Sequence, residues 1–216
     1  PKGENQTWLT VTEGMSLTKL KTNEEHNHSH DHDHANDHKH DHEPSEHNHL
    51  EYDPHIWQSP KLTKETVFKI STLLKKIRPE EAKNIENCTQ DYIKKIDADV
   101  LQLKKQIESL PQEKRVLATN HDALGYFATE FGFKIISIIG LSDESAPTAS
   151  QLKNVITQIK SENIPAIFLE STGNMRNIKT VSKETGVKIG GTLYSDSLGA
   201  KGSGAESAPE MWKANV

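Results

Sequence analysis

The sequence predicts an α/β fold with parallel sheets, because two patterns divide the chain at Pro111. After Pro111, short runs of apolar, mostly β-branched residues alternate with helical segments, which is typical of βαβ units. Before it, apolar residues from Pro79 to Leu110 recur mostly at steps of three, four or seven, which predicts one long helix. This helix fits either half of a helical hairpin or coiled coil, or a rigid strut between two lobes.

The composition is that of a globular protein interrupted by one polar segment. The chain has 216 residues, 33% of them hydrophobic and 26% charged, with a net charge of −5. Lys and Arg form no stripe, so we expect no nucleic-acid partner. No apolar run is long enough to cross a membrane. The single cysteine, Cys88, excludes an intrachain disulfide and a cysteine-based zinc motif.

The elements before Pro79 are expected in this order. The chain begins PKGENQTW, without a Met or a basic-then-apolar leader, so we expect that a signal peptide was removed or that the sequence is a fragment. Trp8–Val11 is predicted to be a short β run. Thr22–Glu51 is too polar to offset the entropy of ordering, which predicts a disordered loop in the metal-free state. Ser59 and Pro60 then begin a helix as N-cap and first helical residue.

After Pro111 the predicted strands are 115–119, 133–139, 166–169 and 187–193, and the predicted helices are 122–131, 148–162 and 174–185. Ligands of parallel sheets gather at the carboxyl ends of the strands. Three polar segments lie there: 120–122, 170–172 and 194–196.

Two of these segments carry candidate ligands. His121 follows a strand directly, so it is either a metal ligand or a histidine bonded within its loop. We expect Asp122 to be the N-cap of the following helix. Asp196, in TLYSDSLG, is either a ligand or a turn residue before a glycine-rich loop.

A further candidate, His55, lies in EYDPHIWQSP. Pro54 restrains the backbone just before it, and Trp57 is placed to cover the site from water. Asp53 is placed to accept a hydrogen bond from the imidazole, as outer partners of metal-binding histidines do.

The polar segment is rich in potential metal ligands. Its H-x-H units alternate with Asp, and imidazole with carboxylate is the ligand set that suits Zn²⁺. A disordered chain must lose entropy to close around an ion, so we expect several weak sites that are accessory to a better one. The accessory ligands are His26, His28, His30, His32, His34, His38, His40, His42, His47 and His49.

DPHIWQSP, ATNHDALGYFATEFG and TLYSDSLG occur in this order, and together they resemble the zinc- and manganese-binding solute-binding proteins of bacterial ABC transporters. The acidic, histidine-rich insertion before DPH resembles the zinc members. The resemblance covers nearly the whole chain and implies two α/β lobes with parallel sheets, joined by a long rigid helix. Residues 1–78 would be the remainder of the N-terminal lobe, with the loop at 22–51. Residues 79–110 would be the linking helix and 111–216 the C-terminal lobe.

The resemblance also implies the metal site. Its ligands fall on His55, His121 and Asp196, with Asp53, Trp57 and Glu170 as supporting residues. Manganese members tend to have Glu where His121 stands, so Zn²⁺ is favoured over Mn²⁺. The family's first histidine has no match in this chain, so we expect an incomplete N-terminal lobe and a ligand set that is one short.

The implied function is a high-affinity zinc receptor, not an enzyme, that delivers the ion to a membrane ABC permease. We expect a monomer outside the cytoplasmic membrane, either free in the periplasm or lipid-anchored. Three alternatives remain open. The first is a manganese receptor of the same family, and the second is a metal buffer based on the histidine run. The third is a zinc hydrolase with Asp122 or Glu170 as general base, although the chain has no H-E-x-x-H motif.

Overall fold

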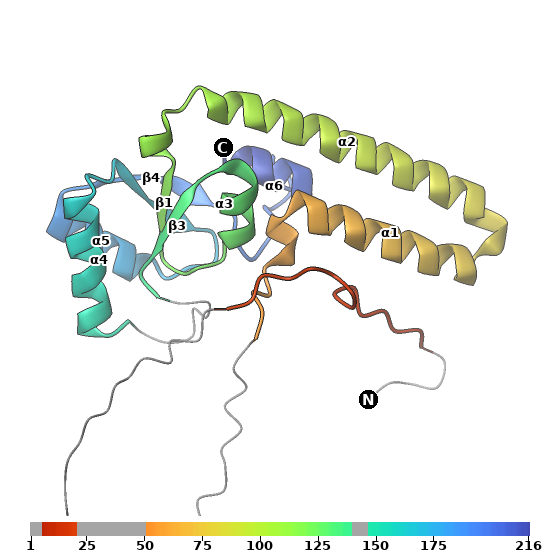
Figure 1. The fold of residues 1–216 in the computed structure, drawn as a ribbon, viewed down its shortest axis with the longest axis horizontal. Coiled ribbons are helices and arrows are strands. Elements are labelled where there is room, and N and C mark those ends of the chain that lie inside the picture. The colour runs from red at the N-terminus through yellow and green to blue at the C-terminus, as the bar shows by residue number, and fades with distance from the viewer. Residues whose placement is uncertain (1–5, 21–50, 140–146) are drawn as a thin grey trace, which may run out of the picture.

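The computed structural model describes residues 6–20, 51–139 and 147–216 (Figure 1). Three short 3₁₀ turns accompany the regular elements: η1 (Ile56–Gln58), η2 (Pro79–Glu81) and η3 (Gln112–Lys114). The helices are α1 (Pro60–Ile77), α2 (Ala82–Glu108), α3 (Gly125–Phe131), α4 (Ala149–Ser161), α5 (Met175–Thr185) and α6 (Ala208–Ala214). The strands are β1 (Val116–Thr119), β2 (Lys134–Ser137), β3 (Ala166–Glu170) and β4 (Lys188–Leu193).

Helices α1 and α2 form a hairpin that extends from the α/β part of the molecule (Figure 1). As predicted, Ser59 caps α1 by accepting a hydrogen bond from the Leu62 N–H, and Pro60 is the first helical residue. A buried hydrogen bond of 2.8 Å between Thr89 and Ser71 ties the two helices together. The first half of α2 therefore has a helical partner, which fits the hairpin reading of its apolar periodicity.

The second half of α2 covers the sheet. With 27 residues, α2 is about 40 Å long at 1.5 Å per residue. Its buried residues Ile96, Leu103 and Ile107 pack in one core with Phe127 of α3 and Trp212 of α6. The helix is shorter than predicted because Pro79–Glu81 form a separate 3₁₀ turn before it. In the described residues α2 therefore packs on α1 with its first half and on the α/β core with its second half.

Parallel strand pairing is confirmed, in two two-stranded sheets that lie side by side. β1 pairs with β2 and β3 pairs with β4, both in parallel, and β1 lies against β3. One core, on the side of α2, α3 and α6, contains Leu117 of β1. A second core, on the side of α4 and α5, contains the next residue, Ala118, with Ile159 and Val181. Because successive strand residues point to opposite faces, the sheet is the middle of three layers.

Two local predictions are wrong. Trp8–Val11 is not a strand: Trp8 is 60% exposed, and the only β contact of the described residues 6–20 is a bridge from Lys19 to Tyr52. A strand needs a partner, and the described part of the chain offers this run none. Asp122 is not a helix N-cap, because α3 begins at Gly125 after Leu124, without a side-chain cap.

No helix in the described residues is long and apolar enough to cross a membrane. The ten histidines from His26 to His49, and nearly all of the predicted loop at 22–51, lie outside the described residues.

Candidate metal centre

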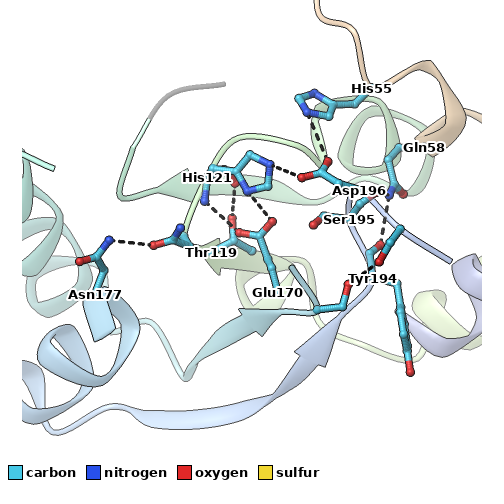
Figure 2. Close-up of polar contacts among 12 residues, drawn as sticks. His55, Gln58, Thr119, His121, Glu170, Asn177, Tyr194, Ser195 and Asp196 are labelled. Atoms are coloured by element: carbon cyan, nitrogen blue, oxygen red, sulfur yellow. Dashed lines mark hydrogen bonds and ion pairs between the residues drawn. The ribbon is translucent and has the colours of Figure 1, made fainter. Parts of the chain in front are cut away.

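Three segments meet at the carboxyl end of the sheet (Figure 2). His121 follows β1, Asp196 follows β4, and His55 directly precedes η1. His121 Nε2 lies 3.0 Å from Asp196 Oδ2, and His55 Nε2 lies 3.5 Å from Asp196 Oδ1. One ligand atom from each residue lies within 4.8 Å of the other two, a spacing at which one ion can contact all three. The three residues singled out in the sequence are therefore brought together.

Each imidazole has a carboxylate beside its Nδ1 atom. Asp53 Oδ1 lies 2.7 Å from His55 Nδ1 and also accepts the His55 backbone N–H at 2.9 Å. Glu170 Oε2 lies 2.6 Å from His121 Nδ1, while its Oε1 accepts the His121 backbone N–H at 2.9 Å. A carboxylate facing Nδ1 favours a proton on that atom, which leaves Nε2 as the ligand. The structure thus places Asp53 beside His55 and Glu170 beside His121.

The site is buried on the histidine side and open on the aspartate side. His55 is 4% exposed and His121 is 1% exposed, whereas the side chain of Asp196 is 32% exposed. Asp53 and Glu170 are buried as well. Solvent therefore reaches the three ligands from the direction of Asp196.

The charges of the site favour a cation. Burial alone would lower the pKa of His121, but the interactions with Asp196 and Glu170 outweigh burial and raise the pKa to about 10. The same contact with His121 lowers the pKa of Asp196, although burial opposes this. In the metal-free protein at neutral pH, His121 is therefore an imidazolium between two carboxylates. A divalent ion would replace its proton at Nε2.

Asp122 lies beside this centre but not in it. Burial raises its pKa, and the nearby charge of Asp53 raises it further. The pKa also responds to the charges of His55 and His121. Its carboxylate is not part of the three-residue ligand cluster.

Trp57, which was expected to cover the site from water, lies against the imidazole and is 38% exposed; it also makes a contact that was not predicted. Its ring meets that of His55 edge-on, with centroids 5.4 Å apart and an interplanar angle of 75°. Its Nε1 donates a hydrogen bond of 2.7 Å to the carbonyl of Ser195. Trp57 therefore contacts both the residue before η1 and the backbone just before Asp196.

Gln58 and Asn215 were missed in the sequence, although both hold the backbone that carries Asp196. Gln58 Nε2 donates to the carbonyls of Ser195 at 2.7 Å and Tyr194 at 3.1 Å. Asn215 accepts the Tyr194 N–H at 2.8 Å and donates to its carbonyl at 2.9 Å. Gln58 had one local signal, its place in the motif DPHIWQSP, whereas Asn215 had none.

Chemically, the centre offers two imidazole nitrogens and one or two carboxylate oxygens from Asp196 to a single ion. Mixed nitrogen and oxygen ligands suit borderline divalent ions such as Zn²⁺, and carboxylate also accepts Mn²⁺. The carboxylates behind the imidazoles increase their basicity and hence their strength as ligands. The centre is suited to holding a divalent cation.

Comparison with known proteins agrees with this chemistry. Residues 2–216 match the family ZnuA, described as zinc-uptake complex component A, periplasmic. The zinc-binding protein TroA of Treponema pallidum is 32% identical over 157 residues, covering 70% of this chain and 51% of TroA. The manganese-binding lipoprotein MntA of Bacillus subtilis is 32% identical over 170 residues, covering 76% of this chain and 56% of MntA. The iron-binding protein YfeA of Yersinia pestis is 36% identical over 151 residues, covering 69% and 49%.

The fold agrees as well. The solved structure of TroA superposes with a TM-score of 0.73 at 31% identity, covering 76% of this chain and 61% of TroA. The chain spans about half the length of the curated relatives it matches. It belongs to the ZnuA family of metal-binding, periplasmic substrate-binding proteins of ABC transporters.

Proposed function

We propose that this chain is the zinc receptor of an ABC importer, with His55, His121 and Asp196 as ligands of the transported ion. The observation that carries the proposal is the convergence of two imidazole Nε2 atoms on one carboxylate, with a buried carboxylate behind each ring. Such outer carboxylates are the usual partners of metal-binding histidines. A histidine buried only for packing would not need this arrangement.

Zinc is the proposed cargo because imidazole is a better ligand for Zn²⁺ than for Mn²⁺. The zinc-binding relative TroA supports this choice. Manganese is the alternative, because MntA is as similar to this chain as TroA is. The two ions differ most in their demand for oxygen ligands, so the relative affinity is the quantity to measure.

The proposed mechanism is capture and release without bond chemistry. The incoming ion displaces the proton on His121 Nε2 and is neutralised by the ionised Asp196. The hydrolase alternative with Glu170 as general base is disfavoured, because both oxygens of Glu170 already contact His121. Binding followed by transfer to a permease fits these residues better than turnover.

The setting follows from the same proposal. The partner is a membrane ABC permease, and the receptor is a monomer that works in the periplasm or at the outer face of the cytoplasmic membrane, free or lipid-anchored. The relatives include a lipoprotein and the family is described as periplasmic, which supports this location. The division into lobes at residues 78 and 110, and a further ligand from the N-terminal lobe, remain predictions.

The histidine run would serve the centre as an accessory that raises the local concentration of metal. A plain buffer, in which the run is the only metal site, is the competing account. Deleting the histidine run separates the two accounts. Tight binding is lost if the run is the only metal site, and it is retained if the run is an accessory.

The test is a calorimetric titration of Zn²⁺ and Mn²⁺ into the intact protein, a deletion of residues 22–50, and the variants His121→Ala and Asp196→Asn. Asp91→Asn, on an exposed part of α2, is the matched control for the last variant. We expect one tight Zn²⁺ site that survives the deletion and the control. Loss of His121 or Asp196 should cost more than the roughly 10–100-fold that outer partners contribute.

Two results would overturn the proposal. If the deletion removes all tight binding while His121→Ala does not, the histidine run is the real site. If the intact protein binds Mn²⁺ more tightly than Zn²⁺, the cargo is manganese and the zinc assignment is wrong. Circular dichroism of each variant checks that the fold is retained.

A further inference from the structure

Gln58 is an unusual residue for its place in the fold. It closes the η1 turn, three residues after His55, and its side chain is fully buried with 0% exposure. Its amide nitrogen donates to two consecutive carbonyls, those of Tyr194 and Ser195, directly before Asp196 (Figure 2). Gln58 therefore contacts the backbone directly before one proposed ligand, Asp196, from the turn that follows another, His55.

The link continues to His55. The backbone N–H of Gln58 donates to the carbonyl of His55 at 3.0 Å. One residue thus ties the His55 backbone, through its own N–H, to the Ser195 carbonyl, through its side chain. Together with the hydrogen bond from Trp57, this link joins the segments of His55 and Asp196, which are far apart in the sequence and have no strand pairing between them.

The fold alone does not account for a glutamine here. The Ser195 carbonyl also accepts from Trp57 Nε1, and the Tyr194 carbonyl also accepts from Asn215 Nδ2, so neither needs Gln58 to be satisfied. Gln58 Oε1, meanwhile, is buried without a hydrogen-bond partner among the described residues, which costs free energy. An apolar side chain of similar shape would fit the fold at least as well.

We propose that Gln58 is a positioning residue that holds Asp196 at the distance from His55 and His121 that a metal ion requires. The inference rests on the proposed metal-binding function and adds to it a residue that does not touch the ion. A buried polar residue that a well-packed core would replace is expected where function, not stability, determines the side chain. Two donors on one carbonyl, from Trp57 and Gln58, restrict its movement in two directions.

The test compares the intact protein with Gln58→Met, which keeps the length and unbranched shape of the side chain but removes both N–H donors. Gln102→Met is the matched control, because Gln102 is exposed on α2 and away from the centre. Zn²⁺ affinity is measured by competition with a chromophoric chelator, and the dissociation rate by mixing the zinc-loaded protein with excess chelator. Ligand geometry is read from the visible absorption spectrum of the Co²⁺ form.

Gln58→Met is expected to bind Zn²⁺ about 10–100-fold more weakly, which is the usual effect of losing an outer partner. The dissociation rate should rise and the Co²⁺ spectrum should shift. The melting temperature of the metal-free protein should stay the same or rise, because an unpaired buried oxygen is removed. A purely structural residue would give the opposite pattern, a lower melting temperature with an unchanged Co²⁺ spectrum.

The outcomes separate the two proposals. If Gln58→Met matches the parent protein in affinity, dissociation rate and Co²⁺ spectrum, while His121→Ala has lost binding, the positioning role is wrong and the proposed function stands. If His121→Ala also binds Zn²⁺ as tightly as the parent, the proposed centre is wrong and the role of Gln58 fails with it. Gln102→Met should behave as the parent in every measurement.

Discussion

Replacing Glu170 with glutamine tests whether the carboxylate behind His121 sets its state as a ligand. Glu170 is buried; its Oε1 accepts a hydrogen bond from the His121 backbone N–H at 2.9 Å, and its Oε2 lies 2.6 Å from His121 Nδ1. Glutamine has one acceptor and one donor in the same space. Whichever way its amide is turned, an NH₂ group faces either the backbone N–H or Nδ1.

The expected cost follows from these contacts. If the amide oxygen keeps the backbone N–H, the NH₂ group faces Nδ1 and favours the tautomer with its proton on Nε2, the atom proposed to bind metal. To bind an ion through Nε2, His121 must then move its proton to Nδ1, where it faces the NH₂ group as a buried donor without an acceptor, at a cost of about 1–3 kcal/mol. At about 1.4 kcal/mol for each factor of ten, Glu170→Gln should weaken Zn²⁺ binding roughly 5–150-fold.

The assay is competition for Zn²⁺ with a chelator, together with nitrogen NMR of the histidine rings to identify the tautomer of His121. Glu162→Gln is the matched control, because Glu162 is an exposed partner of Lys134. The reasoning is refuted if Glu170→Gln binds Zn²⁺ as tightly as the control. It is also refuted if affinity falls while His121 keeps its proton on Nδ1.

Four further predictions follow from the same centre. Zn²⁺ affinity should fall as the pH is lowered from 7 to 5, because protons compete for the imidazoles; a flat profile would exclude histidine ligation. Because the pKa of His121 is raised to about 10, Zn²⁺ binding at pH 7 should release its proton, measured by calorimetry in two buffers of different ionisation enthalpy. A pKa raised above the unfolded value of about 6.5 stabilises the metal-free fold fully below that pH and no longer above about 10. The melting temperature of the metal-free protein should therefore decline across this window, and a rise would contradict it. Trp57→Phe keeps a ring against His55 but removes the bond to Ser195, so affinity should drop about 2–10-fold, as for one hydrogen bond; no change would show that the ring alone matters.

Much of the fold could be predicted because local chemistry agrees with the final structure. Thr148 and Asn174 cap α4 and α5 where the helices were expected to begin, and the first of them forms a full capping box. The parallel strands were recognisable as short apolar runs because both faces of the sheet are covered by helices. Such patterns can be predicted because each residue type matches the capping position or the burial of its own site.

The failures have a different cause. Trp8–Val11 has the composition of a strand, but whether it becomes one depends on a partner elsewhere in the chain. Asp122 precedes a helix in the sequence and has a good capping side chain, but the helix begins only at Gly125, after Leu124. A favourable cap residue therefore did not decide where this helix begins.

The candidate site shows the same division. His55, His121 and Asp196 could be named because each lies in a motif of the resembled family. Asp53 could be named because it is two residues from His55. Gln58 and Asn215 act on a backbone segment more than twenty residues away in the sequence, which no local pattern reports.

The three proposed ligands differ in burial, and this difference implies the order in which they would release a metal ion. The side chain of Asp196 is partly exposed to solvent, whereas both imidazoles are buried and each has a carboxylate beside its Nδ1. If the proposed function holds, an acceptor group that approaches from outside would meet the ion on the Asp196 side and replace the oxygen ligand first, while both imidazoles still bind. Transfer would then proceed by stepwise exchange of ligands, without a free, hydrated ion.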